Sequence, residues 1–244
     1  MEEIEGPQIF EWLSRILGHH IPKEMLICWF VVLLLIVLAA LARRKLALRP
    51  GALQNFFEMV WEYISALCVQ LGGPQNVKFM PLYATLFLFI LFSNWLGLLP
   101  GMSSPTMNVN VNAAMALIVA FSTEAMNIRQ KGAIGYVKHF CGPPYWLAPM
   151  FIIIRGLEIF TRPLSLTMRL FGNMLAKEII LGVLVYMATL FFFAPDVMSK
   201  LLLPVPLILR PAIILLGVLV GVVQALVFTA LSMAYIGSAY AEHH

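Results

Sequence analysis

Long uninterrupted runs of apolar residues dominate this chain, and the first of them covers residues 25–42. A strand that crosses a membrane alternates apolar and polar side chains, whereas a helix in lipid bonds its own backbone and can be apolar throughout. The run therefore favours a helix. The chain is 61% hydrophobic and only 11% charged, whereas soluble domains carry about 25% charged residues. These features predict an all-α integral membrane protein.

Two further apolar runs, at residues 80–99 and 113–128, predict two more membrane spans. Two longer arms follow at 150–193 and 204–240, and each exceeds the roughly 20 residues that cross a bilayer at a normal tilt. Either the first arm is two spans, or both arms are long, strongly tilted helices that form a hairpin. Hydropathy alone allows both. The chain is expected to be one polytopic membrane domain with about five to six membrane helices.

Two segments between the spans have a different character. Residues 51–72 place Glu58 and Glu62 among large apolar side chains. This pattern predicts an amphipathic helix that lies along the cytoplasmic surface of the membrane. Residues 139–149 have the composition of an irregular, re-entrant connection.

Basic residues indicate the orientation of the chain. Arg43 and Arg44 follow the first span, and Arg129 and Lys131 follow the third. By the positive-inside rule both of these ends lie in the cytoplasm. The acidic N-terminal segment, residues 1–24, is then expected outside.

A charged segment inside the first long arm is the strongest functional signal. Residues 162–178 read RPLSLTMRLFGNMLAKE, and Arg169 lies deep in the apolar run. An arginine at the centre of a bilayer costs roughly 3 kcal/mol on insertion scales, so it normally faces protein or a water-filled cavity. The default hypothesis for such a residue is an ion pathway. Arg169 is therefore the main candidate functional residue.

Other polar residues of this arm share a helix face with this arginine. At about 100° per residue in an α-helix, they fall within roughly 40° of one line. They are Arg155, Glu158, Arg162, Ser165, Arg169 and Asn173. Glu158 is spaced to pair with Arg155 or with Arg162. For these two arginines, anchoring of the helix end by snorkelling to the headgroups is an equally good interpretation.

Two more polar residues lie elsewhere on the arms. Glu178 is on roughly the opposite face from Arg169 and ~14 Å along the axis. We expect a separate aqueous pocket around it, with a salt bridge to Lys177 or to another span as the alternative. In the last arm Gln224 shares a face with Tyr235. A buried glutamine often joins helices, but together with Arg169 it predicts that the two arms jointly enclose a polar site.

These residues resemble subunit a of the F-type ATP synthases. The segment 162–178 is similar to that family's signature around its essential arginine. The segment GVVQALVFTALSMAYI, at 221–236, resembles the C-terminal signature, with Gln224 and Tyr235 at matching positions. SNWLGLLPG, at 93–101, followed by PTMNVNVN, also resembles a family segment.

The resemblance implies a stator subunit, not catalytic by itself, that forms two offset half-channels against a rotating c-ring. Ions, with protons favoured, would enter by one half-channel and leave by the other. Arg169 would match the arginine that separates the two, and Asn173, Glu178 and Gln224 match positions near the ring or lining the channels. The implied partners are the c-ring, a b-type peripheral-stalk subunit and the rest of the ATP synthase. The implied location is the bacterial inner membrane.

The chain departs from the family pattern at several positions. Asn108 stands where the family often has an aspartate, and Arg155 stands where an acid is common. Lys177 occupies a position that is frequently small or acidic, and Gly217 one that is histidine in some members. These departures bear on the route that an ion takes to Arg169.

Two other function classes fit part of the pattern. An independent secondary transporter would also use buried Arg and Glu, but it predicts pseudo-symmetric halves, and no convincing repeat is visible. An intramembrane hydrolase would need a nucleophile and base within the spans, and the histidines lie at predicted membrane edges or at the terminus. The three cysteines have no CxxC spacing. We therefore expect no metal site and no cofactor, and the net charge of +4 follows the basic loops and implies no nucleic-acid partner.

Overall fold

The computed structural model describes residues 23–44, 50–99, 102–141 and 148–241. Within this part of the chain the structure is helical and contains no strand. Five of its helices are long and apolar enough to cross a membrane. The prediction of an all-α integral membrane protein is confirmed.

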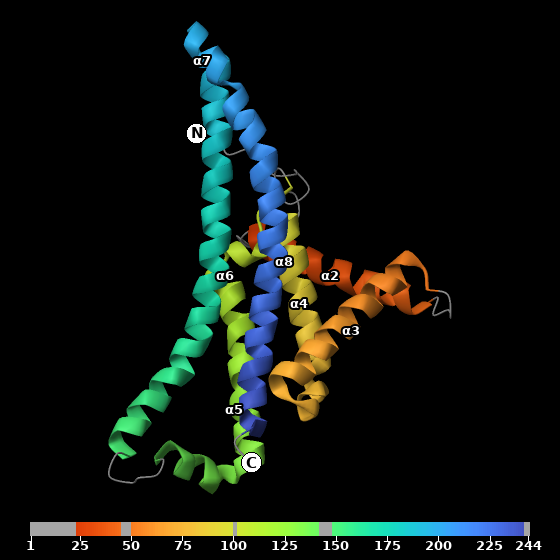
Figure 1. The fold of residues 1–244 in the computed structure, drawn as a ribbon, viewed down its shortest axis with the longest axis vertical. Coiled ribbons are helices and arrows are strands. Elements are labelled where there is room, and N and C mark those ends of the chain that lie inside the picture. The colour runs from red at the N-terminus through yellow and green to blue at the C-terminus, as the bar shows by residue number, and fades with distance from the viewer. Residues whose placement is uncertain (1–22, 45–49, 100–101, 142–147, 242–244) are drawn as a thin grey trace, which may run out of the picture.

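The two long arms form a helical hairpin. Helix α6 (Ala148–Phe193) and helix α8 (Pro204–Ala241) run side by side and are joined at one end by the short helix α7 (Val197–Leu202), as Figure 1 shows. The first arm is one continuous helix of 46 residues, so the alternative of two separate spans does not apply.

Helix α6 bends away from the hairpin in its N-terminal half (Figure 1). Pro163 lies inside the helix, where a proline removes one backbone hydrogen bond and clashes with the preceding turn. The bend leaves space between this half of α6, α5 (Val109–Cys141) and α8.

The core of the molecule lies where α4 (Met80–Leu96), α5 and α8 pack together with the middle of α6. Its largest fully buried side chains include Tyr83, Ile90, Leu170 and Phe228. Apolar residues from all four helices meet there because each helix turns one face inward. The polar residues discussed below lie around the edge of this core.

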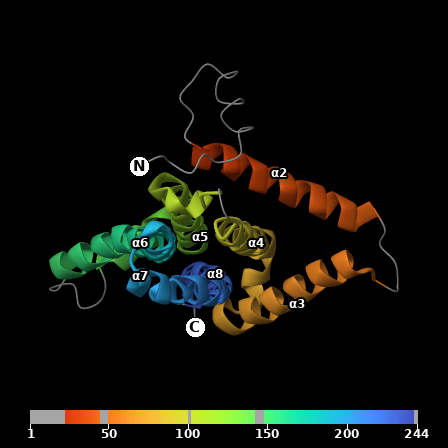
Figure 2. The ribbon, with the colours of Figure 1, turned by 90° about the horizontal axis from the view of Figure 1, so that it is seen from above.

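Two helices extend sideways from the bundle, α2 (Lys23–Arg44) and α3 (Ala52–Gly72), with α4 between them (Figure 2). Helix α3 is amphipathic: Ile64 and Cys68 are buried, whereas Glu58 and Glu62 are exposed. The 3₁₀ turn η1 (Pro74–Phe79) connects α3 to α4.

Some element boundaries differ from those expected from the sequence. Helix α4 ends at Leu96, and α5 begins at Val109, since Asn108 Oδ1 accepts a hydrogen bond from the Asn110 backbone N–H at 2.9 Å and caps the helix. The connection expected at 139–149 is helical at both ends, and its middle lies outside the described residues, as does most of the segment 1–24.

Candidate functional site

Arg169 lies near the middle of α6, with its side chain at the surface of this chain. Leu166 and Leu170, on either side of it, are 2% and 0% exposed and face the core. Among the residues that the structure describes, no carboxylate lies within ion-pairing distance of the guanidinium. A charge in this position is costly in lipid, so it requires water or a group from another chain.

Asn173 and Gln224 join the two arms one helical turn beyond this arginine. Asn173 Nδ2 donates a hydrogen bond of 2.7 Å to Gln224 Oε1. Gln224 is only 5% exposed, and its Nε2 has no partner in the described part of the chain. A buried amide without a partner is costly, which favours a water molecule at this nitrogen.

An ion pair lies on the N-terminal side of Arg169 along α6. Arg162 contacts Glu158 at 3.2 Å, and its guanidinium carbon lies 5.1 Å from the centre of the Tyr235 ring of α8. A cation over an aromatic face is attracted to it. Ser165, one turn short of Arg169, is exposed on the same side of the helix.

Lys177 and Glu178, although adjacent, have different environments. Lys177 is half-buried, and its Nζ donates to the Asn94 carbonyl at 3.3 Å. Its stem passes Gly217, where a Cβ would lie 3.1 Å from Lys177 Cδ. Glu178 is exposed, and no ion pair joins it to Lys177 within the described residues. The alternative of a Lys177–Glu178 salt bridge is therefore wrong for this structure.

A buried polar cluster surrounds this lysine contact, and sequence reasoning missed it. Asn94 Oδ1 accepts from Thr106 Oγ1 at 2.9 Å, and Asn94 Nδ2 donates to the Gly221 carbonyl at 3.3 Å. Asn112 Nδ2 donates to the Thr106 carbonyl at 2.6 Å. The density of Asn, Ser and Thr in residues 103–112 is the signal that could have identified the cluster.

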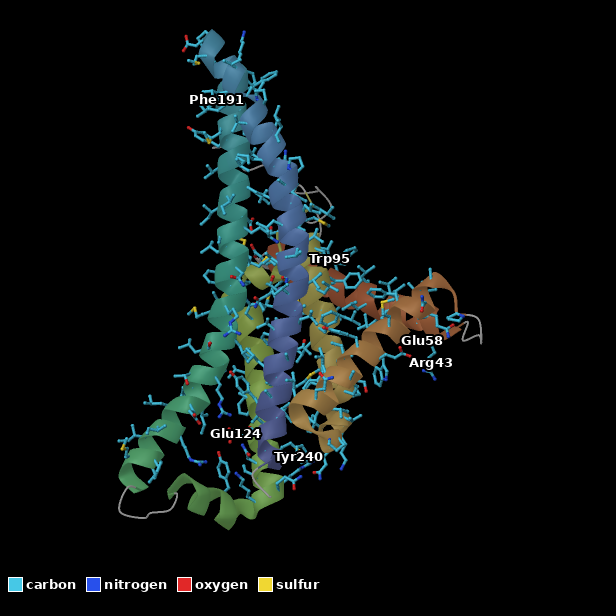
Figure 3. All side chains as sticks on the ribbon, in the orientation of Figure 1. Arg43, Glu58, Trp95, Glu124, Phe191 and Tyr240 are labelled. Carbon is cyan, nitrogen blue, oxygen red and sulfur yellow. The ribbon has the colours of Figure 1, made fainter. Side chains whose placement is uncertain are left out.

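The bent half of α6 encloses a cavity of about 390 Å³ with α5 and α8. Figure 3 shows Glu124 in this space, whereas Trp95, next to Asn94, lies farther toward the other end of the bundle. The cavity is lined by Glu124, Asn127, Tyr136, Phe151, Ile154, Arg155, Glu158, Ile159, Arg162 and Ser238. Three residues singled out from the sequence, Arg155, Glu158 and Arg162, thus meet there. Glu124 was missed, although it is an isolated acid in an apolar run.

Arg169 therefore lies between two polar regions along α6. Arg162 lies ~10 Å away toward the cavity, and Lys177 lies ~12 Å away toward the Asn94 cluster, at 1.5 Å per residue. A guanidinium does not give up its proton in a protein. It can attract a carboxylate, by about 4 kcal/mol at 4 Å with an effective dielectric constant near 20.

Comparison with known proteins gives one consistent result. The ATP synthase A chain family matches residues 25–237 of this chain. The chain is 43% identical to ATP synthase subunit a 1 of Syntrophotalea carbinolica over 216 residues, which is 88% of this chain and 85% of that protein. It is 42% identical to ATP synthase subunit a of Trichlorobacter lovleyi over 88% of this chain and 86% of that protein. It is 42% identical to ATP synthase subunit a of Solidesulfovibrio magneticus over 92% of this chain and 87% of that protein.

Proposed function

This chain belongs to the ATP synthase A chain family, and from that premise we propose that it carries protons past a rotating ring of c subunits. It is a multi-pass membrane subunit of the bacterial F-type ATP synthase, part of the stator and not catalytic by itself. Because the chain belongs to this family, we do not pursue the independent-transporter and hydrolase alternatives.

The observation that carries the proposal is the exposed Arg169 without a carboxylate partner among the described residues. The missing partner is a carboxylate of the c-ring. An approaching ring carboxylate is attracted to the guanidinium and loses its proton, because the charge favours the ionised acid. The fixed cation also repels protons and prevents a direct leak between the two half-channels.

The cavity lined by Glu124, Arg155 and Glu158 is assigned to the half-channel on the cytoplasmic side. Asn127 and Tyr136 line it, and the basic Arg129 and Lys131 lie between them in the sequence. The positive-inside rule places this end of α5 in the cytoplasm. The same rule places the N-terminus outside.

The outer half-channel is assigned to the region of Lys177, Glu178 and Gln224, between α6, α8 and α4. The hydrogen bonds of Asn94 and Thr106, and the partnerless Gln224 Nε2, support it, because they supply polar groups that can hold water inside the bundle. Glu178, exposed on another face of α6 from Arg169, is placed as a proton-exchanging group of this channel.

The ring is placed against the α6 face that carries Ser165, Arg169 and Asn173, all three of which are exposed on this chain. A b-type peripheral-stalk subunit completes the stator. Purification of the complex in mild detergent, followed by quantitative mass spectrometry, tests these partners. We expect a small two-span protein with a membrane carboxylate in many copies per copy of this chain, and its absence would contradict the proposal.

A further inference from the structure

A bend in α5 brings together two residues that a straight helix would keep apart. Gly132 has φ 69° and ψ 161°, a conformation that glycine adopts without strain. Beyond it, Tyr136 Oη donates a hydrogen bond of 2.5 Å to Glu124 Oε2. In a straight helix these two residues would be separated by ~18 Å along the axis. The bend therefore creates the contact.

Glu124 lines the cavity and also borders a second, smaller space beside it. This second space of about 10 Å³, enough for about one water molecule, is lined by Glu124, Arg162 and Tyr235. The charged groups that line the large cavity with Glu124 are Arg155, Glu158 and Arg162, all from α6. The uncharged polar groups there are Asn127 and Tyr136 of α5 and Ser238 of α8.

Of these groups, Glu124 is the best suited to exchange a proton. The two arginines keep their protons, and Glu158 is paired with Arg162 at 3.2 Å. Glu124 instead accepts a hydrogen bond from a neutral phenol, that of Tyr136. Burial, together with the neighbouring Glu124, raises the pKa of Tyr136 above its usual value, so the phenol stays a hydrogen-bond donor at physiological pH.

We propose that Glu124 is a proton-exchange group of the cytoplasmic half-channel and that Tyr136 is the positioning residue that holds its carboxylate against the cavity. This inference rests on the proposed function. During synthesis the ring carboxylic acid gives its proton to cavity water, the Glu124 carboxylate accepts a proton from that water, and the resulting acid releases it to the cytoplasm. One proton moves, and only O–H bonds form and break.

The test uses Glu124→Gln in the assembled ATP synthase in membrane vesicles. The amide has nearly the shape of the carboxylic acid and still accepts the Tyr136 hydrogen bond, but it cannot take up a proton. We measure passive proton conduction after removal of the catalytic sector, per assembled complex. A positioned acid–base group typically contributes 10²-fold or more. Because water remains in the cavity, we expect a smaller loss, of about tenfold.

Three further variants separate exchange from packing. Glu124→Asp keeps a carboxylate and should stay within about twofold of wild type, and Tyr136→Phe should slow conduction about threefold. The double variant Glu124→Gln/Tyr136→Phe should conduct no more slowly than Glu124→Gln alone, because the hydroxyl acts through the carboxylate. The matched controls are Glu58→Gln on the exposed face of α3 and Tyr186→Phe on the exposed face of α6, and both should conduct normally.

A purely structural role of Glu124 predicts that Glu124→Gln conducts at the wild-type rate, and that result would overturn the inference. Should Glu124→Gln fail to assemble, Tyr136→Phe decides: a reduced rate supports the inference and a wild-type rate contradicts it. The variant Arg169→Ala is measured in parallel. If Arg169→Ala still supports ATP synthesis, the proposed function is wrong. If Arg169→Ala abolishes synthesis but Glu124→Gln conducts protons at the wild-type rate, the inference alone is wrong.

Discussion

Asn173 of α6 and Gln224 of α8 are joined by a hydrogen bond of 2.7 Å, one helical turn from Arg169. This bond fixes the rotation of one long helix against the other at the level of the arginine. It also leaves Gln224 Nε2 buried without a partner among the described residues. The geometry at Arg169 therefore depends on a contact between residues 51 positions apart in the sequence.

A double-mutant cycle tests this coupling. Asn173→Ala and Gln224→Ala should each slow proton conduction, and the double variant should be little slower than either single one. The expected coupling energy is about 1 kcal/mol, or roughly fivefold in rate. Thr189→Ala removes a hydroxyl that bonds only within α6 and serves as the control. Single effects that multiply in the double variant would show that the bond does not couple the two helices.

Cysteine cross-linking tests which face of α6 meets the c-ring. Cysteines at Ser165 and Asn173 should cross-link to a cysteine on a c subunit, because both positions share the Arg169 face. A cysteine at Glu178 should not, but it should react with small water-soluble thiol reagents or silver ions. Efficient cross-linking from 178 with no product from 173 would mean that the ring contacts the other face of α6.

The sequence was enough to predict a membrane protein with two long helical arms, because apolar runs and basic ends are local signals. Arg169 could be identified for the same reason, because an isolated charge in an apolar run stands out in the sequence wherever the helix packs. The hydrogen bond between Asn173 and Gln224 could not be predicted, since it depends on the register and rotation of two helices. The pattern indicated only that both residues belong to a shared polar site.

The contacts of Glu124 and Asn94 show the limit of sequence reasoning more sharply. Gly132 lies in a polar stretch near a helix end, where a glycine is unremarkable, and nothing local indicates that the bend returns Tyr136 to Glu124. The sequence indicates only that Asn94 belongs to a membrane span, yet its side chain forms hydrogen bonds with Thr106 and with the Gly221 carbonyl. Both contacts arise from the path of the chain between distant elements.

The orientation of the chain is tested by cysteine labelling in a cysteine-free background. A cysteine at Ala52, exposed at the start of α3, should react with a membrane-impermeant reagent only from the cytoplasmic side. A cysteine at Leu99, which is 53% exposed beyond α4, should react only from outside. The reverse labelling pattern would contradict the orientation derived from the basic segments.

The contact between α8 and the end of α3 depends on two glycines. A Cβ at Gly237 would overlap the Cα of Gly72, and backbone cannot move aside as a flexible side chain can. Gly237→Ala should therefore lower the stability of the purified chain by about 1–3 kcal/mol, seen as earlier thermal unfolding in detergent. Gly182→Ala on α6, where nothing lies within 4 Å, is the control. Equal unfolding temperatures for the two variants would rule out this close packing.

The most direct test of the central claim is ATP synthesis driven by an imposed proton gradient in vesicles that carry Arg169→Ala. We expect normal amounts of assembled complex and no gradient-driven synthesis, because the fixed cation that meets the ring carboxylate is gone. Arg169→Lys should fail as well, since a compact ammonium lacks the planar, five-donor geometry of the guanidinium. Synthesis at a near-normal rate in assembled Arg169→Ala complexes would contradict the account.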